Sequence, residues 1–550
     1  MPTATEPDAR RWITLAIIII SLLIVVLDST VLNVAIPTIL RDLHTELPSL
    51  QWVLTGYALT FATLLVIGGR LGDIYGPRRM FIIGAALFGV GSLIASESTS
   101  VAMLLLGEAV IEGIGASLMM PATLAILSNT FDGHERATAF SVWGAATGVA
   151  VAFGPVLGGF LTTSYSWRWA FRINVIVAPL AILATVLFIR RPAPTLRRPK
   201  VDVLGALLIG SGTFCAVFAL SQGGIYGWLR PLQDFTIGSF EAWPDSWPIS
   251  MIVPMLGLSA TLLAAFVVLE KRKERMDSDP LFQMSQLRHL SFRYGLLTTA
   301  VLAMGQLGFL FVLPVLLQDG SRHLSAIDTG LWLVPSGVSI AIGAQIGGRL
   351  TRVVNTTVVV RIGLASEAVG LVMLAMVATS SITFLRLLPG LIVFSVGLGF
   401  ASSQLTNVVL SEIKKEHAGA ASGANTTVRQ MGAALGIAFI GTLLSTQMLR
   451  HAGDAIRGST LAADVKARAL DQLHASGVGF VPPASLTHAI ENAVASGARP
   501  ALLFAAFVVS CGALLSLLIP HVDPVVPKDA ELTESLVLVE PIDVEPSLID

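Results

Sequence analysis

Charge is scarce in this sequence. Only 13% of its 550 residues are Asp, Glu, Lys or Arg, which is about half the share found in soluble domains. Hydrophobic residues make up 54% of the chain, and the mean hydropathy is +0.76. A chain of this composition is predicted to be an integral membrane protein rather than a soluble one.

Other absences narrow the function. The two cysteines, Cys215 and Cys511, both lie in apolar runs, which argues against a disulfide framework or a thiolate metal site. There is no basic patch for nucleic acid and no P-loop sequence for ATP. Nothing resembles a nucleophile elbow or a Rossmann loop, so we expect neither an enzyme nor a bound cofactor.

Long apolar runs fill most of the chain. Each is roughly 20 residues or longer, enough for a helix to cross a bilayer, and short polar connectors separate them. The pattern predicts fourteen spans, near residues 13–34, 50–70, 80–97, 102–128, 137–161, 169–189, 202–222, 249–270, 294–317, 326–348, 356–378, 384–410, 418–446 and 500–520.

Two short sequences recur at offsets of roughly 280 residues: "GGRL", and "GIGASLMM" echoed by "GLGFASSQ". A duplicated bundle, common among transporters, would give such echoes. We therefore predict a six-helix bundle over 1–190, two inserted helices over 191–290, a second six-helix bundle over 291–520 that includes an external segment 447–499, and a disordered acidic cytoplasmic tail over 521–550.

Alternate connectors are rich in Lys and Arg, as in "GRLGDIYGPRR", "EKRKERMDSDP" and "SEIKKEH". The positive-inside rule then places these connectors and both chain termini in the cytoplasm. The low ratio of Lys to Arg is typical of bacteria with GC-rich genomes, so we expect a bacterial inner membrane.

The loop "GRLGDIYGPRRM" after the second span joins small residues to charged ones. Gly69 and Gly76 allow close backbone approach and a tight turn, and Asp73 beside Arg78 is predicted to form a breakable clasp between helix ends. This stretch resembles the loop signature of the major facilitator superfamily, which implies a gating role for these four residues.

Three further stretches are similar to the fourteen-helix drug:proton antiporters of the QacA and EmrB type: "LDSTVLNVAIP", "GVAVAFGPVLGG" and "HAGAASGANTTVRQMGAALG". The resemblance implies an all-α major facilitator fold of two six-helix bundles with two extra central helices. It also implies multidrug efflux driven by the proton motive force.

The second of these stretches resembles the antiporter hinge motif of the fifth span. Its small residues and one proline make a helix face without bulky side chains, which can approach another helix closely and bend. The resemblance implies a rocking contact, and ordinary small-residue packing is the alternative. The residues are Gly148, Gly154, Pro155, Gly158 and Gly159.

Glu108 and Glu112 lie one helical turn apart in the apolar fourth span. A bare carboxylate there costs about 2.5–3.5 kcal/mol on insertion scales, and two neighbours repel each other. We expect at least one to carry a proton in some transport state, so the pair is a candidate proton-coupling site. The alternative is a purely structural pairing with a base such as Arg172 or Arg429.

The same helix departs from the family pattern. The fourth-span motif R-x-x-Q-G is represented here by Ala109, Glu112 and Gly113. The role of the missing arginine therefore does not carry over, and either proton coupling is organised differently or the cargo is shifted toward cations.

Polar residues inside other spans are further candidates. Asp28, near Asn33, matches the acid of the first-span motif and is predicted to have a coupling or cavity role. Glu367 is either a site residue or a partner for Arg361.

In the thirteenth span, Arg429 and Asn425 form a polar patch. The resemblance implies a structural or gating role there, with Arg429 able to neutralise one of the glutamates.

The sequence thus predicts a monomeric, proton-coupled exporter of amphipathic, cationic compounds, with no metal and no cofactor. Its partners would be the small-molecule cargo, protons and the lipid bilayer. One alternative is an exporter of a neutral or anionic metabolite, antibiotic or lipid. A non-transporting membrane receptor or scaffold is a third interpretation.

Overall fold

The computed structural model of the chain is built almost entirely of helices. The structure describes residues 10–45, 47–131, 133–189, 202–237, 240–276, 278–318, 324, 326–351, 353–414, 417–459, 461–476 and 486–521. The predicted acidic tail over 521–550 lies outside these residues except for His521.

In chain order the helices and strands are α1 (Arg10–Asp42), α2 (Leu47–Tyr75), α3 (Pro77–Ser96), α4 (Val101–Leu104), the π-helix η1 (Leu105–Glu112), α5 (Gly113–Thr130), α6 (Gly133–Ser164), α7 (Trp169–Phe188), α8 (Val203–Tyr226), β1 (Phe235–Ile237), β2 (Phe240–Trp243), α9 (Ile252–Arg275), the 3₁₀-helix η2 (Met284–Arg288), α10 (Leu290–Gln318), α11 (Ala326–Leu350), α12 (Thr356–Val377), α13 (Phe384–Val409), α14 (Ala418–Gly458), α15 (Ala463–Ser476) and α16 (Thr487–Ser516).

The long apolar runs form helices because a helix satisfies its own backbone hydrogen bonds where no water is available. Within the described residues, thirteen helices are long and apolar enough to cross a membrane. The 32-residue helix α6 stands where the fifth span was predicted. Each of the fourteen predicted spans overlaps a helix, which confirms an all-α membrane protein.

The segment predicted as an external connector, 447–499, is helical over most of its described residues. Helix α14 continues through 41 residues to Gly458, and α16 already begins at Thr487. Between them α15 packs on both neighbours through a small apolar core that includes Ile456, Leu473 and Ile490. Much of the predicted connector therefore extends two of the spanning helices.

The helices form two groups that meet along two seams. Helices α1 to α7 pack on one another, and α10 to α14 pack with α16. The groups touch where α2 lies against α14 and where α6 lies against α11. The division of the chain at residues 190 and 290 stays a prediction, and these contacts are compatible with it.

Glycines allow the same close helix crossing in both groups. A Cβ on Gly115 of α5 would lie 2.7 Å from the carbonyl oxygen of Gly84 in α3, and one on Gly397 of α13 would lie 2.6 Å from that of Gly363 in α12. The two pairs are separated by about 280 residues along the chain, the same offset as the sequence echoes. Backbone-to-backbone crossings of this kind require residues without side chains.

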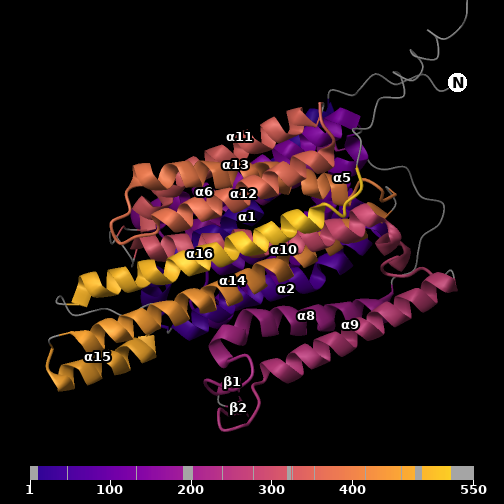
Figure 1. Ribbon diagram of the computed structural model, residues 1–550. Helices are drawn as coiled ribbons and strands as arrows, with labels where there is room; N and C mark the ends of the chain where they lie inside the picture. The colour runs from indigo at the N-terminus through magenta and orange to yellow at the C-terminus, as the bar shows by residue number, and fades with distance from the viewer. Residues whose placement is uncertain are drawn as a thin grey trace, which may run out of the picture.

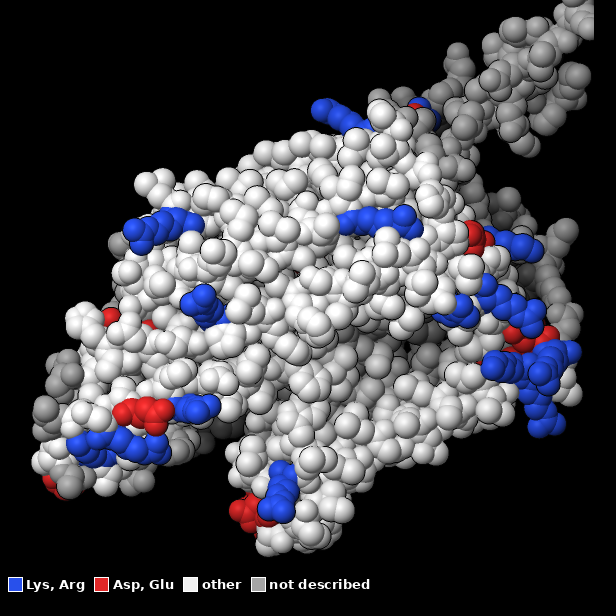
Figure 2. Space-filling view, viewed as in Figure 1, with Lys and Arg blue, Asp and Glu red and all other residues white. Residues whose placement is uncertain are grey.

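Helices α8 and α9 lie beside the bundle as a separate pair (Figure 1). Helix α8 contacts both α2 and α14, whereas α9 packs mainly on α8. Asp202 caps α8 by accepting a hydrogen bond of 2.8 Å from the Gly205 N–H, and it pairs with Lys273 of α9. The last turn of α9 is basic, and Lys and Arg side chains gather there at the right of Figure 2.

Candidate functional site

Three acids from two segments meet inside the first helix group. Asp28 comes from α1, and Glu108 and Glu112 come from η1. One carboxylate oxygen from each residue lies within 4.8 Å of the others, and the three side chains are 4%, 1% and 0% exposed. This spacing suits acids that share protons, and the oxygens are also close enough to coordinate a cation. The sequence predicted the glutamate pair, and the structure adds Asp28 to it.

The acids have few partners. Asn174 of α7 donates a hydrogen bond of 2.8 Å from Nδ2 to Oδ1 of Asp28. Within the described part of the chain, neither carboxylate oxygen of Glu112 has a hydrogen-bond partner, and Oε2 of Glu108 lacks one as well. Buried carboxylates with so few donors and no base beside them are costly when charged.

Tyr57 of α2 adds a hydroxyl to the cluster. Its side chain is buried, lies within electrostatic range of all three acids, and has no hydrogen-bond partner for its hydroxyl among the described residues. Sequence reasoning missed Tyr57 and Asn174. A polar residue in the run "FRINVIVAPL" was the available signal for Asn174, whereas a tyrosine in an apolar span gives none.

The glutamates lie on a π-helix rather than on the ordinary helix predicted over 102–128. The N–H of Gly113 donates to the carbonyl oxygen of Glu108, five residues back. Segments of this kind are rare and often occur at functional sites. The wider turn still leaves the two side chains on one face, against α3, where a Cβ on Gly91 would lie 2.6 Å from Cγ of Glu112.

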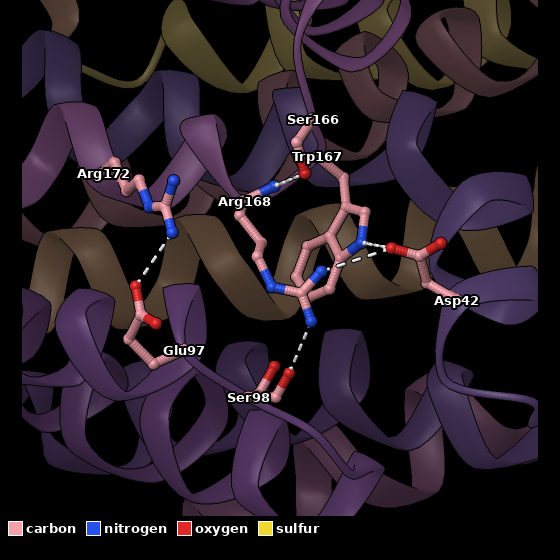
Figure 3. Close-up of polar contacts among 7 residues, drawn as sticks. All are labelled: Asp42, Glu97, Ser98, Ser166, Trp167, Arg168 and Arg172. Atoms are coloured by element: carbon pink, nitrogen blue, oxygen red, sulfur yellow. Dashed lines mark hydrogen bonds and ion pairs between the residues drawn. The ribbon is translucent and has the colours of Figure 1, made fainter.

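Neither of the bases considered as a structural partner pairs with the glutamates. Arg172 donates 3.0 Å from Nη2 to Oε1 of Glu97 at the far end of α3, as Figure 3 shows. Arg429 donates 3.3 Å from Nη2 to Oγ1 of Thr406. The structural pairing considered for Glu108 and Glu112 is therefore wrong for both bases.

The end of the first helix group where Arg172 meets Glu97 also carries a polar network (Figure 3). Trp167 is fully buried and donates 2.9 Å from Nε1 to Oδ2 of Asp42, at the end of α1. Arg168 lies over the Trp167 ring, with Cζ 4.4 Å from the centroid, and donates to both Asp42 and the carbonyl of Ser98. These contacts tie the ends of α1 and α3 to the start of α7.

The predicted clasp of the gating loop has a different partner. Asp73 accepts hydrogen bonds of 2.8 and 2.9 Å from the backbone N–H groups of Gly419 and Ala420, in the first turn of α14. Arg78 instead donates to the carbonyl oxygens of Thr185 and Val186 at the end of α7. The clasp therefore joins the two helix groups through a carboxylate at a helix N-terminus and not through an Asp73–Arg78 pair.

Two glycines of the loop have the roles expected of them. Gly69 packs backbone to backbone against Gly419, because a Cβ at either position would collide with the other's carbonyl oxygen. Gly76 has a φ of 93° at the start of α3, in the region that favours glycine.

A cavity lies between the two helix groups, beside α6, α10, α11, α13 and α14. The cavity and the solvent at its opening together measure about 610 Å³. Aromatic rings of Trp143, Phe309 and Phe394 line it, together with polar side chains such as Gln306. Arg429 is the one charged residue among its lining residues, and the three clustered acids are not among them.

Arg429 is held at the cavity wall by neutral groups. Besides its bond to Thr406, its Cζ lies 5.9 Å from the centroid of the Trp143 ring. Asn425, one turn earlier on α14, turns its Oδ1 to Thr299 at 3.2 Å. The predicted polar patch thus divides between the cavity and the packing of α14 on α10.

The remaining predicted residues lie apart from both places. Glu367 is completely buried in α12 with neither oxygen hydrogen-bonded in the described part of the chain. Arg361 donates instead to carbonyls at the end of α16, including that of Ile519, so it is not the partner of Glu367. The side chain of Asn33 lies outside the described residues.

The predicted hinge motif lies in α6. Gly158 packs against Val31 of α1, where a Cβ would approach the backbone to 3.0 Å, and Gly154 is buried. The surroundings of Gly148, Pro155 and Gly159 lie outside the described residues. A rocking role for this motif stays a prediction.

Comparison with known proteins agrees with this architecture. The sequence profile of the Major Facilitator Superfamily matches residues 18–437. The chain is 35% identical over 445 residues to a probable actinorhodin transporter of Streptomyces coelicolor, covering 80% of this chain and 73% of the relative. It is 32% identical to a puromycin resistance protein of Streptomyces alboniger, covering 84% and 86% of the two chains.

A solved structure, the human organic anion transporter MFSD10, superposes with a TM-score of 0.56 at 15% identity, over 92% of this chain and 100% of that one. At this identity the likeness concerns the fold alone. Together with the profile match over most of its length, it leaves one conclusion: the chain belongs to the major facilitator superfamily of membrane transporters.

Proposed function

We propose that the chain exports amphipathic compounds in exchange for protons, by alternating access between its two helix groups. The observation that carries this proposal is the buried cluster of Asp28, Glu108 and Glu112, which has no basic partner within the described residues. Acids in such a place bind and release protons as their hydration changes, which is what coupling requires. Relatives named as an antibiotic transporter and a resistance protein support an export role.

The cargo would occupy the aromatic cavity and the protons would occupy the acid cluster. Alternating access needs a contact between the groups that can break, and the bonds from Gly419 and Ala420 to Asp73 supply one. The cationic cargo predicted from the glutamates has weak support, because none of the three acids is among the lining residues of the cavity.

The membrane placement forms part of the same proposal. The basic end of α9 lies on the side where the positive-inside rule puts the cytoplasm. In that orientation the Asp73 contact closes the cytoplasmic side, and the protein would act as a monomer in a bacterial inner membrane.

The test is proton flux in liposomes. Purified protein is reconstituted with an acidic interior and a trapped pH-sensitive dye, and a panel of amphipathic cationic, neutral and anionic compounds is added outside. We expect proton efflux upon addition of a transported compound, and its loss in Glu112→Gln, which removes one proton site without changing side-chain volume.

Glu270→Gln is the matched control, because Glu270 is also completely buried but lies in α9, outside the acid cluster. Efflux should persist in that variant. If no compound evokes efflux from well-folded protein, or if the two variants are impaired equally, the acid cluster does not couple protons to export.

A further inference from the structure

The lining of the cavity between the helix groups carries one positive charge and no negative charge. Its walls are aromatic, aliphatic or neutral polar, except for the guanidinium of Arg429. No ion pair holds Arg429 within the described residues, and the side chain is only partly covered. A cation in an apolar cavity without a counter-charge is a costly arrangement unless a ligand supplies one.

The guanidinium of Arg429 also has more N–H donors than it has hydrogen-bond acceptors among the described residues. It carries five N–H donors, and among the described residues it makes one hydrogen bond, from Nη2 to Oγ1 of Thr406. The Trp143 ring on its other side restricts where it can point. A fixed guanidinium with free donors suits two-point binding of a planar anionic group such as a carboxylate.

Two phenylalanines of the lining supply a place for an aromatic framework. Phe309 of α10 and Phe394 of α13 are in contact, with ring centroids 4.2 Å apart, and both line the cavity. Gln306, one turn before Phe309 on α10, adds a neutral donor and acceptor. A cargo with a flat aromatic body and one acidic group would place each part against a matching surface.

We propose that the preferred cargo is an aromatic compound bearing an anionic group, such as a carboxylate, and that Arg429 binds that group. The inference rests on the proposed function, because it takes the cavity to be the cargo site. It reverses the cation preference that the sequence predicted. The reason is that the acids and the cavity, which a sequence cannot place relative to each other, are separate.

The test compares three probes that share one framework: pyrenebutanoate, its neutral amide pyrenebutanamide, and the cation pyrenebutylamine. Each is equilibrated by dialysis against full-length protein in lipid nanodiscs, with empty nanodiscs as the blank for partition into lipid. We expect the carboxylate to bind at least about tenfold more tightly than the amide, because hydrogen bonds to charged groups are the stronger ones. The ammonium probe should bind most weakly.

Variants then assign the preference. Arg429→Gln should remove the advantage of the carboxylate while leaving the affinity for the amide within about twofold, and Arg429→Lys should keep part of it. Arg386→Gln is the matched control, because it removes an exposed arginine at the start of α13, away from the cavity.

Equal binding of the three probes by the wild type, tighter binding of the ammonium probe, or a carboxylate preference that survives in Arg429→Gln would overturn the inference. The wild-type comparison decides the first two outcomes without any variant. The measurement uses no gradient, so failure of proton coupling leaves it interpretable. Loss of efflux in liposomes together with an intact probe preference would refute the proposed coupling alone.

Discussion

Asp73 on α2 accepts a hydrogen bond of 2.8 Å at Oδ1 from the backbone N–H of Gly419 on α14, a residue 346 positions further along the chain. Together with the bond to Oδ2 from Ala420, it joins the two helix groups at one end of their seam. The contact is made by a charged acceptor and a helix N-terminus, so it combines hydrogen bonding with the helix dipole.

Asp73→Asn should weaken the closed end of the seam. The amide keeps one acceptor but turns an N–H₂ group toward the second donor, and hydrogen bonds to charged groups contribute about 1.5–3 kcal/mol. We expect the open population at this end to rise about tenfold. The readout is the alkylation rate of a cysteine introduced as Ser141→Cys, in a protein whose two native cysteines are changed to serine. Ser141 is buried, and its hydroxyl accepts a hydrogen bond from Gln404 of the other helix group.

The control for Asp73→Asn is Glu97→Gln, which neutralises an acid at the opposite end of the first helix group. It should leave the alkylation rate unchanged. An unchanged rate in Asp73→Asn as well would mean that this contact does not hold the seam.

Gly69→Ala should separate α2 from α14. A Cβ at Gly69 would collide with the carbonyl oxygen of Gly419, whereas at Gly72, nearly one turn later, the nearest atom would be Cα of Pro77 at 4.0 Å. Alanine favours a helix over glycine by about 1 kcal/mol, so any loss has to come from the collision. We expect transport to fall sharply in Gly69→Ala and to persist in Gly72→Ala, and equal activity of the two would argue against a tight seam.

Tyr57→Phe should slow proton-coupled transport while leaving cargo affinity unchanged. The substitution removes the hydroxyl near the three acids and keeps the ring that stacks on Phe61, with centroids 5.9 Å apart. Losing a donor able to stabilise a charged carboxylate in one state should lower kcat about tenfold. Tyr226→Phe, in the aromatic contact between α8 and β1, is the control. A change in KM alone would place Tyr57 on the cargo path instead.

Trp167→Phe should destabilise the fold. Trp167 is fully buried, and its loss as a donor leaves Asp42, among the described residues, with the partly exposed Arg168 as its one partner. The lost hydrogen bond and the smaller ring should together lower the melting temperature by several degrees in detergent. The same substitution at Trp247, which is 47% exposed, should change it little. Equal melting temperatures for the two variants would show that the Figure 3 network does not contribute to stability.

Asp202→Asn should have an effect that depends on pH. Burial alone would raise the pKa of Asp202, but hydrogen bonds with Glu270 and Lys273 and the N–H of Gly205 bring it below the ordinary 3.8. The unfolded chain therefore binds this proton more readily. The charged residue contributes stability above about pH 3.8 and loses that contribution as the pH falls through the lower folded-state pKa.

The measurement for Asp202 is the difference in melting temperature between wild type and Asp202→Asn. It should shrink as the pH falls below the ordinary pKa of 3.8. A difference that grows on acidification would mean that the folded-state pKa is raised and that the ion pair with Lys273 does not dominate.

The sequence was informative wherever one helix was enough. Apolar length predicted the spans, and the spacing of Glu108 and Glu112 predicted that they share a face. It was uninformative wherever the answer depends on the distance between helices. Nothing in a single sequence indicates that Asp28 joins the glutamates, that Asp73 reaches α14 rather than Arg78, or that the acids do not line the cavity.

The sequence failed to predict the π-helix for a different reason. Apolar periodicity cannot distinguish i→i+5 from i→i+4 bonding over eight residues, since both leave residues four apart on nearly the same side. Pairing of Arg429 with one of the buried glutamates was an alternative that the sequence left open. The structure instead places it against Thr406 and Trp143.

Helix α8 touches α2 and α14 at once, whereas the opposite seam, between α6 and α11, has no such helix laid over it among the described elements. A change in the angle between the two helix groups must therefore slide α8 against α2 and α14 on one side, whereas on the side of α6 and α11 it only displaces lipid. The resistance to this motion therefore differs between the two sides of the transporter. Substitutions on the face of α8 that meets the seam, such as Gln222, which donates to Thr55 of α2, should change how fast the groups interconvert before they change what the cavity binds.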